Sequence, residues 1–242
     1  MSTQTPSHKY QVTLKNRSTV AERTMAFQFE KPPGFTFRPG QYLEVTLLNP
    51  AETDAEGNGR ALSIASAPHE DSLMVATRMR DTAFKRVLAN LPLGAPVQIE
   101  GPNGSLTLHN NTARPAVFIV GGIGITPVRS ILARAAHEHL PHKLLLLYLN
   151  RRPQDAAFLE ELTGLQKQNA NFHLVPIMTA ATGWSGEKGH LTPDLLKKYA
   201  DPATSPLYYL VGPPGMVNGV HELLNQAGVD DDDIRLEDFG GY

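Results

Sequence analysis

Gly121-Gly-Ile-Gly-Ile-Thr-Pro127 directly follows the apolar run Ala116-Val-Phe-Ile-Val120, and this stretch decides the fold of the second half of the chain. A short continuous apolar run is typical of a strand that is buried on both faces. Glycines after such a strand allow a sharp turn with room for a ligand beside the backbone, and proline suits the first turn of a helix. The motif predicts a nucleotide site formed by Gly121, Gly122, Gly124, Thr126 and Pro127.

The rest of this half continues the alternation of strand and helix. We expect strands at residues 116–120, 143–149, 172–178 and 207–211, and helices at residues 127–139, 156–168, 193–199 and 215–227. Buried strands that alternate with helices form a doubly wound parallel sheet, whose ligand lies beyond the carboxyl ends of the strands. Residues 111–242 are therefore predicted to form an α/β nucleotide-binding domain.

The first half has a different pattern, in which short β-rich runs are separated by turn residues. These runs lie at residues 10–14, 24–29, 42–47, 61–65, 73–78 and 96–100, and they predict a small antiparallel β-barrel over residues 1–110. One helix is expected at residues 83–90, with Asp81 or Thr82 as its N-cap. A helix N-terminus in a barrel of this kind suits phosphate binding. The polar segment 109–115, which ends in proline, reads as the linker of a two-domain chain.

Arg60-Ala-Leu-Ser63 carries the clearest chemistry of the first half. It follows a polar, glycine-containing loop, and its small, apolar and hydroxyl residues suit a strand that lies flat against a planar ring. A guanidinium binds phosphate through two parallel hydrogen bonds, so Arg60 is a candidate ligand for a cofactor phosphate. With the glycine-rich turn, this segment indicates a flavin and a nicotinamide nucleotide bound by successive domains.

Composition narrows the possible functions. The 22 basic and 24 acidic residues are interspersed, which gives no sign of a nucleic-acid or membrane partner. The chain has no cysteine, so disulfides and thiolate-bound metal centres within it are excluded, and its nine histidines show no metal-ligand spacing. We assign no metal, and redox chemistry would need an organic cofactor. The N-terminus has no signal-peptide pattern and no apolar run approaches the ~18 residues that span a bilayer, which predicts a soluble cytoplasmic protein.

Several segments together, in order, resemble the ferredoxin–NADP reductase superfamily. Members of this family pair a barrel domain that binds FAD with an α/β domain that binds a pyridine nucleotide. The resemblance covers nearly the whole chain. The matching segments are Phe37-Arg-Pro-Gly-Gln-Tyr42, Arg60 to Ser63, Gly101-Pro-Asn-Gly104, Gly121 to Pro127, Gly212-Pro-Pro-Gly-Met216 and Glu237-Asp-Phe-Gly-Gly-Tyr242.

For the flavin, the resemblance implies that Arg60 binds FAD phosphate and that Ser63 lies near flavin N5. Ala61 lies between them, and Leu62 replaces the tyrosine of the family, which removes an aromatic ring and a hydroxyl. The family's phosphate helix begins Gly-x-x-Ser, whereas this chain has Asp81-Thr-Ala-Phe84. Backbone amides bind phosphate whatever their side chains, so this segment still qualifies; alternatively, a nearby cation supplies the charge. The candidates are Thr77, Arg78, Thr82, Ala83 and Phe84, with Arg80 and Lys85 as alternative cations.

For the nicotinamide nucleotide, the resemblance implies two loops, Gly121 to Pro127 and Gly212 to Met216. The second adds Gly212, Pro213, Pro214 and Met216 to the candidates. Asn150, Arg151 and Arg152 end the second strand, where the family distinguishes the ribose of NADPH from that of NADH. An arginine there binds a 2′-phosphate, which favours NADPH over NADH.

At the C-terminus, the resemblance implies a carboxylate and an aromatic ring near the flavin. Glu237 is the candidate for proton or nicotinamide contacts, and either Phe239 or Tyr242 for covering the flavin ring. We therefore expect Ser63 and Glu237 to be the catalytic residues.

The resemblance implies an FAD-dependent oxidoreductase that transfers hydride from NADPH or NADH to flavin N5. With no iron-sulfur ligands of its own, it would pass electrons to a separate ferredoxin, flavodoxin, oxygenase component or small molecule. Two alternatives are a flavin reductase that uses exchangeable flavin as a substrate and a non-catalytic nucleotide-binding accessory subunit.

Overall fold

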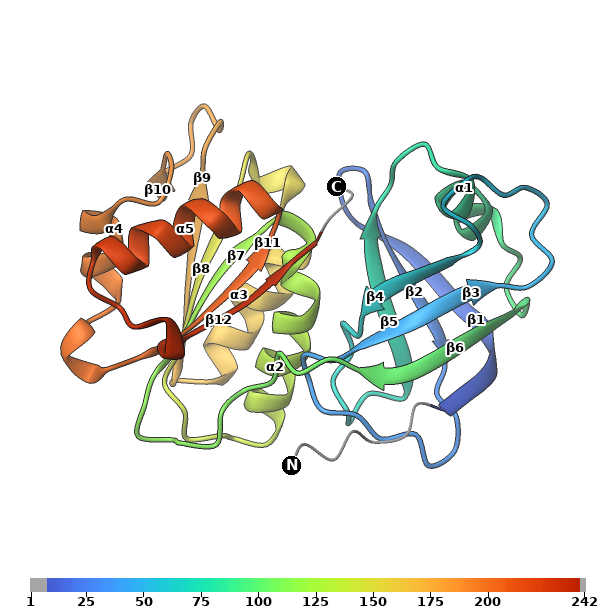
Figure 1. Ribbon diagram of the computed structural model, residues 1–242, viewed down its shortest axis with the longest axis horizontal. Helices are drawn as coiled ribbons and strands as arrows, with labels where there is room; N and C mark the ends of the chain where they lie inside the picture. The colour runs from blue at the N-terminus through green and yellow to red at the C-terminus, as the bar shows by residue number, and fades with distance from the viewer. Residues whose placement is uncertain (1–7, 240–242) are drawn as a thin grey trace.

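The computed structural model describes residues 8–239 and shows two domains side by side, each built on a six-stranded sheet (Figure 1). All strand pairs in the first sheet are antiparallel, and all pairs in the second are parallel. This confirms the predicted fold class, a β-barrel followed by a doubly wound α/β domain. Within the described residues, no helix combines the length and the apolar composition needed to cross a membrane.

The first sheet has the strand order β4-β3-β6-β1-β2-β5. Its strands are β1 (His8–Ala21), β2 (Thr24–Glu30), β3 (Tyr42–Leu47), β4 (Gly59–Ser63), β5 (Ser72–Arg78) and β6 (Pro96–Asn103). A bridge between Ile64 and Val75 joins its two edges just beyond β4, which closes the sheet into a barrel.

Apolar side chains from alternate strand positions fill the barrel. In β3, Leu43, Val45 and Leu47 are buried and the residues between them are half-exposed, the period of two expected of a strand with one face toward a core. Helix α1 (Ala83–Asn90) packs against this core through Phe84 and Leu88. Thr82 caps α1 as predicted, because its hydroxyl accepts a hydrogen bond from the Lys85 amide.

The second sheet has the order β10-β9-β8-β7-β11-β12, with helices on both faces (Figure 1). Its strands are β7 (Ala116–Gly121), β8 (Leu144–Asn150), β9 (Phe172–Met178), β10 (Glu187–Lys188), β11 (Leu207–Gly212) and β12 (Ile234–Asp238). Helices α2 (Ile125–His137) and α3 (Leu159–Gln168) share one apolar cluster with the sheet, and α4 (Pro193–Tyr199) and α5 (Pro214–Gln226) share the other.

This strand order positions the site. From β7 the chain moves to β8 and β9 on one side, and then returns to place β11 and β12 on the other side of β7. The loops after β7 and β11 therefore meet at the carboxyl edge of the sheet. A reversal of strand order of this kind opens a crevice that binds ligands in α/β proteins.

The elements that differ from the sequence prediction include α3, β10 and β12. Helix α3 begins at Leu159 rather than at residue 156, because Phe158 has the left-handed φ of 60° and its ring is buried. Strands β10 and β12 were not expected. They are short, polar edge strands, whose sequences lack the apolar runs that mark the buried strands.

A buried arginine on α2 joins the two domains. The Arg129 side chain is 8% exposed, and its Nη1 lies 2.7 Å from both the Ala65 carbonyl and Glu70 Oε1 of the barrel domain. Its Nη2 donates to Glu161 Oε1 on α3 over 2.6 Å. One guanidinium thus satisfies three acceptors on two domains, and removing it would leave two carboxylates without their cation.

We expect Arg129→Ala to lower the free energy of unfolding by about 1.5–3 kcal/mol, the usual contribution of hydrogen bonds to a charged group, because the Glu70 and Glu161 carboxylates are partly exposed and stay solvated. Urea denaturation measures this change. Arg134→Ala is the matched control on the same helix, because Arg134 pairs with Glu138 at the surface. A pair of that kind contributes roughly 0.3–0.5 kcal/mol. Equal effects of the two substitutions would contradict the assigned role of Arg129.

Candidate functional site

A cavity of about 610 Å³ lies at the carboxyl edge of the second sheet, where the loops after β7 and β11 meet. Its walls come from the ends of β7 and β8, the start of α5, the segment after β9, and one barrel residue, Arg78 of β5. The lining residues used below are Arg78, Gly121, Gly122, Asn150, Arg151, His190, Pro213 and Met216.

Glycines allow the two loops to touch. A Cβ on Gly121 would lie 2.9 Å from Met216 Cε and 3.1 Å from Pro213 Cδ. A Cβ on Gly124 would lie 2.5 Å from the Val211 carbonyl oxygen, which is shorter than any real contact of this type. The backbone of the first loop therefore packs against the second with no space for side chains, and exposed main chain is left facing the cavity.

Asn150 provides an independent sign of a ligand. The residue is 6% exposed, and its Oδ1 and Nδ2 form no hydrogen bond of standard geometry among the described residues, although the Tyr148 side chain interacts with this amide. A polar ligand in the cavity would supply the partners of good geometry that a buried amide needs. The glycine cradle and this amide fit the adenosine and phosphate groups of a dinucleotide.

The structure brings many of the predicted nucleotide-binding residues together. Gly121, Gly122, Asn150, Arg151, Pro213 and Met216 all line the cavity. Arg78, predicted for the flavin site, also lines this cavity and pairs with Asp155 of the second domain over 3.8 Å.

The other predicted nucleotide-binding residues do not line the cavity. Thr126 is buried, and its hydroxyl donates to the Ile123 carbonyl over 3.1 Å. It therefore stabilises the turn that leads into α2. The predicted residues without a place in the cavity wall are Gly124, Thr126, Pro127, Arg152, Gly212 and Pro214.

The two arginines after β8 have different surroundings. Arg151 lines the cavity and forms no ion pair within residues 8–239. Arg152 instead pairs with Asp155 and with Glu22 of the barrel domain, each over 2.9 Å. Arg152 thus connects the domains, whereas Arg151 lines the cavity together with Arg78.

Sequence analysis missed His190, which also lines the cavity. It lies just after the two-residue strand β10, in a segment for which the sequence predicted neither a strand nor a site. Its position next to a parallel edge strand is a property of the sheet, and no motif in the sequence marks it.

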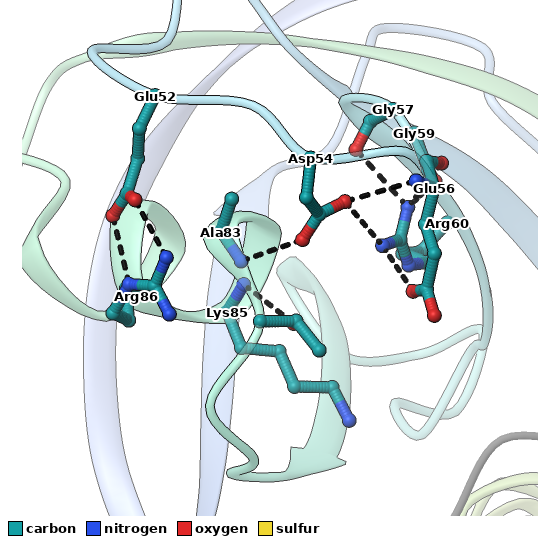
Figure 2. A network of polar contacts seen from close by, with 10 residues as sticks. Glu52, Asp54, Glu56, Gly57, Gly59, Arg60, Ala83, Lys85 and Arg86 are labelled. Carbon is teal, nitrogen blue, oxygen red and sulfur yellow. Dashed lines mark hydrogen bonds and ion pairs between the residues drawn. The ribbon is translucent and has the colours of Figure 1, made fainter.

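The predicted flavin-phosphate groups lie together at the end of the barrel that α1 covers. Arg60 is the second residue of β4, and its guanidinium lies 5.1 Å from the ring centre of Phe84 on α1. The Ala83 amide at the start of α1 donates to Asp54 Oδ2 over 2.8 Å, and Asp54 lies 3.8 Å from Arg60. Figure 2 shows Arg60 and the helix start on either side of the Asp54 carboxylate. An arginine next to a helix N-terminus suits a phosphate. Here the Asp54 carboxylate contacts both the arginine and the helix amide.

The remaining residues predicted for the flavin differ in accessibility. Ala61 is exposed, whereas Ser63 and Thr77 are buried. Leu62 is 6% exposed and packs in the barrel core, as does Phe84. A contact between Leu62 and a flavin ring stays a prediction.

Glu237 lines a second cavity on the seam between the domains, together with Tyr42 of β3 and Arg235 of β12. Ser63 pairs with Tyr42 across β3 and β4 but does not itself line this cavity. Burial raises the pKa of the Glu237 carboxyl above its ordinary value. Phe239 follows, with its amide bonded to the Gly212 carbonyl, and the predicted Tyr242 lies outside the described residues.

Comparisons with known proteins agree with this geometry. The family model described as "Oxidoreductase NAD-binding domain" matches residues 118–222. The chain is 28% identical over 228 residues to ferredoxin–NADP reductase B of Sorangium cellulosum, with 90% of the chain and 91% of that protein covered. It is 29% identical over 217 residues to a flavohemoprotein of Rhodopirellula baltica, with 84% of the chain and 53% of that protein covered.

Among solved structures, the flavohem-like FAD/NAD binding domain of a nitric oxide dioxygenase from Vibrio cholerae superimposes with a TM-score of 0.82 at 20% identity. The match covers 95% of this chain and 98% of that domain. Fold, site and relatives together define a flavoprotein reductase architecture. The chain is similar to proteins of the ferredoxin–NADP reductase superfamily across both domains. It spans nearly all of one relative and about half the length of the flavohemoprotein.

The contact between the glycine loops generates a testable expectation. Gly124→Ala should lower the free energy of unfolding by about 1–3 kcal/mol, because the new Cβ overpacks against the Val211 carbonyl. It should also weaken NADH and NADPH binding together, as titration calorimetry measures. Gly164→Ala on α3 is the control, since its Cβ would meet open space. The control should gain roughly 0.5–1 kcal/mol from helix propensity and keep nucleotide affinity. Unchanged affinity in Gly124→Ala would show that the loop contact does not shape the cavity.

Proposed function

We propose that this chain is an FAD-dependent oxidoreductase that takes hydride from NADPH or NADH and passes electrons to a separate acceptor. Bound FAD would supply the hydride-accepting and one-electron chemistry, and the protein would supply binding, orientation and electrostatics. The observation that carries the proposal is the buried Asn150 amide in a glycine-cradled cavity at the strand-order reversal. Arg78 of the barrel lines this cavity, so a nucleotide bound there would lie next to the proposed flavin domain.

The barrel is assigned to the flavin. Arg60 and Ser63 are three residues apart on one strand, a rise of about 10 Å along the chain. In this assignment Arg60 binds phosphate, Ser63 approaches the ring, and the half-buried Glu237 holds or releases a proton at its carboxyl. We place the domain boundary near residue 110, in the segment between β6 and β7.

The electron acceptor is assigned by class. The relatives are named for ferredoxin and for a flavohemoprotein, which supports a protein or haem acceptor for reductases of this family. For this chain we propose a separate ferredoxin, flavodoxin, oxygenase component or small molecule, because a chain without cysteine holds no iron-sulfur cluster through thiolates.

A flavin reductase is the second candidate. The observation that favours it is that Arg60 already donates hydrogen bonds to Glu56 and Gly59 within the protein. A flavin phosphate that competes with these contacts would be held less tightly. Retention of FAD through gel filtration would identify a tightly bound cofactor, and loss of FAD would favour exchangeable flavin.

Flavin binding tests the barrel assignment. We expect wild-type protein to bind FAD and Arg60→Ala to bind it about 10- to 100-fold more weakly, because a hydrogen bond to a charged group is typically worth ~1.5–3 kcal/mol. Quenching of FAD fluorescence measures both affinities. Absence of any flavin complex with wild-type protein at saturating FAD would overturn the proposed function.

Donor choice tests the difference between the two arginines. Arg151→Ala should raise the Michaelis constant for NADPH about thirtyfold, with little change for NADH, because a lost charge-assisted contact costs ~2 kcal/mol. Arg152→Ala is the matched control and should leave the preference between donors unchanged, because its partners are Asp155 and Glu22. A shift in preference caused by Arg152→Ala, and none by Arg151→Ala, would reverse the assignment.

A further inference from the structure

The loop between β3 and β4 carries three carboxylates that reach the predicted flavin-phosphate groups. We call residues 52–58 the acidic strap. Figure 2 shows Glu52, Asp54 and Glu56 along this strap, with Arg60 of β4 and the first turn of α1 facing them. The strap thus links the two elements on which phosphate binding depends.

Arg60 is bound by this loop. Its Nη2 donates to Glu56 Oε2 over 2.6 Å, and its Nη1 lies within 2.9 Å of the carbonyl oxygens of Glu56 and Gly59. Bidentate phosphate binding would use Nη2, which Glu56 contacts here. Glu56 and a bound phosphate therefore compete for this side of the guanidinium.

The helix amide is engaged as well. Asp54 accepts from the Ala83 amide over 2.8 Å through Oδ2, and its Oδ1 accepts from the Glu56 amide over 3.0 Å. The hydrogen bond from the Ala83 amide, and then that from the Glu56 amide, lowers the pKa of the Asp54 carboxyl, which stays ionised. A fixed negative charge thus lies between Arg60 and the helix N-terminus, where an incoming phosphate would need to lie.

A third contact ties the strap to the outside of α1. Glu52 accepts from Arg86 Nη2 over 2.6 Å and from Arg86 Nε over 2.9 Å. The acidic strap is therefore held at both ends, by Arg86 on α1 and by Arg60 on β4.

The strap is held weakly enough to move. The Glu56 side chain is 66% exposed and that of Glu52 is 43% exposed, and ion pairs with partners this accessible contribute little to stability. A diphosphate brings more charge to Arg60 and to the helix amides than one carboxylate does. Replacement of the strap carboxylates by a diphosphate is therefore favourable, because the ion pairs that are lost are weak.

We propose that the acidic strap is a built-in competitor for the flavin diphosphate, and that Asp54 and Glu56 set how tightly this protein holds FAD. The inference rests on the proposed flavin site at Arg60. FAD binding requires both carboxylates to leave Arg60 and Ala83, so the strap weakens and slows the capture of flavins that carry phosphate. Riboflavin, which has no phosphate, does not compete with the strap.

The test compares wild-type protein with the double variant Asp54→Asn, Glu56→Gln. Both replacements keep the side-chain shape, and the new Asn amide oxygen still accepts from the Ala83 amide, so the fold is retained. Titration with FAD should show at least about tenfold tighter binding to the variant, because two competing charges are gone. Riboflavin affinity should be equal in the two proteins.

The matched control is Glu222→Gln with Asp232→Asn, which removes two exposed carboxylates from the second domain and changes the net charge equally. It should bind FAD as wild-type protein does. Equal or weaker FAD affinity in the strap variant would overturn the inference, and weaker affinity would show that the carboxylates position Arg60 for phosphate. A parallel gain for riboflavin would also overturn it. Failure of both proteins to bind FAD would overturn the proposed function itself, and the inference with it.

Discussion

The buried ion pairs of Arg129 with Glu70 and Glu161 are the constraint on which the rest of the structure depends. The guanidinium satisfies a barrel carbonyl, a barrel carboxylate and a carboxylate on α3, and it lies 5.5 Å from the ring centre of Phe158. A charge in so buried a position is stable only while all of these partners stay in place. The contact therefore fixes α2 against the barrel, and α2 begins at the glycine turn that shapes the nucleotide cavity.

From this constraint the placement of the site follows. The turn after β7 is fixed by α2 on one side and by direct backbone contact with the loop after β11 on the other, where Gly124 approaches Val211. The cavity opens beyond these two loops, and Arg78 of the barrel forms part of its wall. A nucleotide bound by the second domain thus lies next to the first, which is the geometry that hydride transfer between two cofactors requires.

Much of the fold was predictable, because burial leaves a period in the sequence. The apolar run of β7 and the β-rich run of β3 both predicted strands that the structure contains. The half-exposed strand β12 has no such period, and the late start of α3 depends on the conformation of Phe158. Local motifs indicated the cavity loops. They could not separate Arg151 from Arg152, because that difference depends on which arginine Asp155 and Glu22 of the other domain contact. Nor could they indicate that Asp54 would reach the Ala83 amide.

The central claim is that the two domains hold a flavin and a nicotinamide nucleotide in reacting positions. Anaerobic mixing of the FAD-loaded protein with NADPH, and separately with NADH, tests it most directly in a stopped-flow spectrometer. The account predicts that the absorbance of oxidised flavin disappears with at least one donor although no electron acceptor is present. Flavin that stays oxidised while the protein demonstrably binds both FAD and the reduced nucleotide would contradict the account.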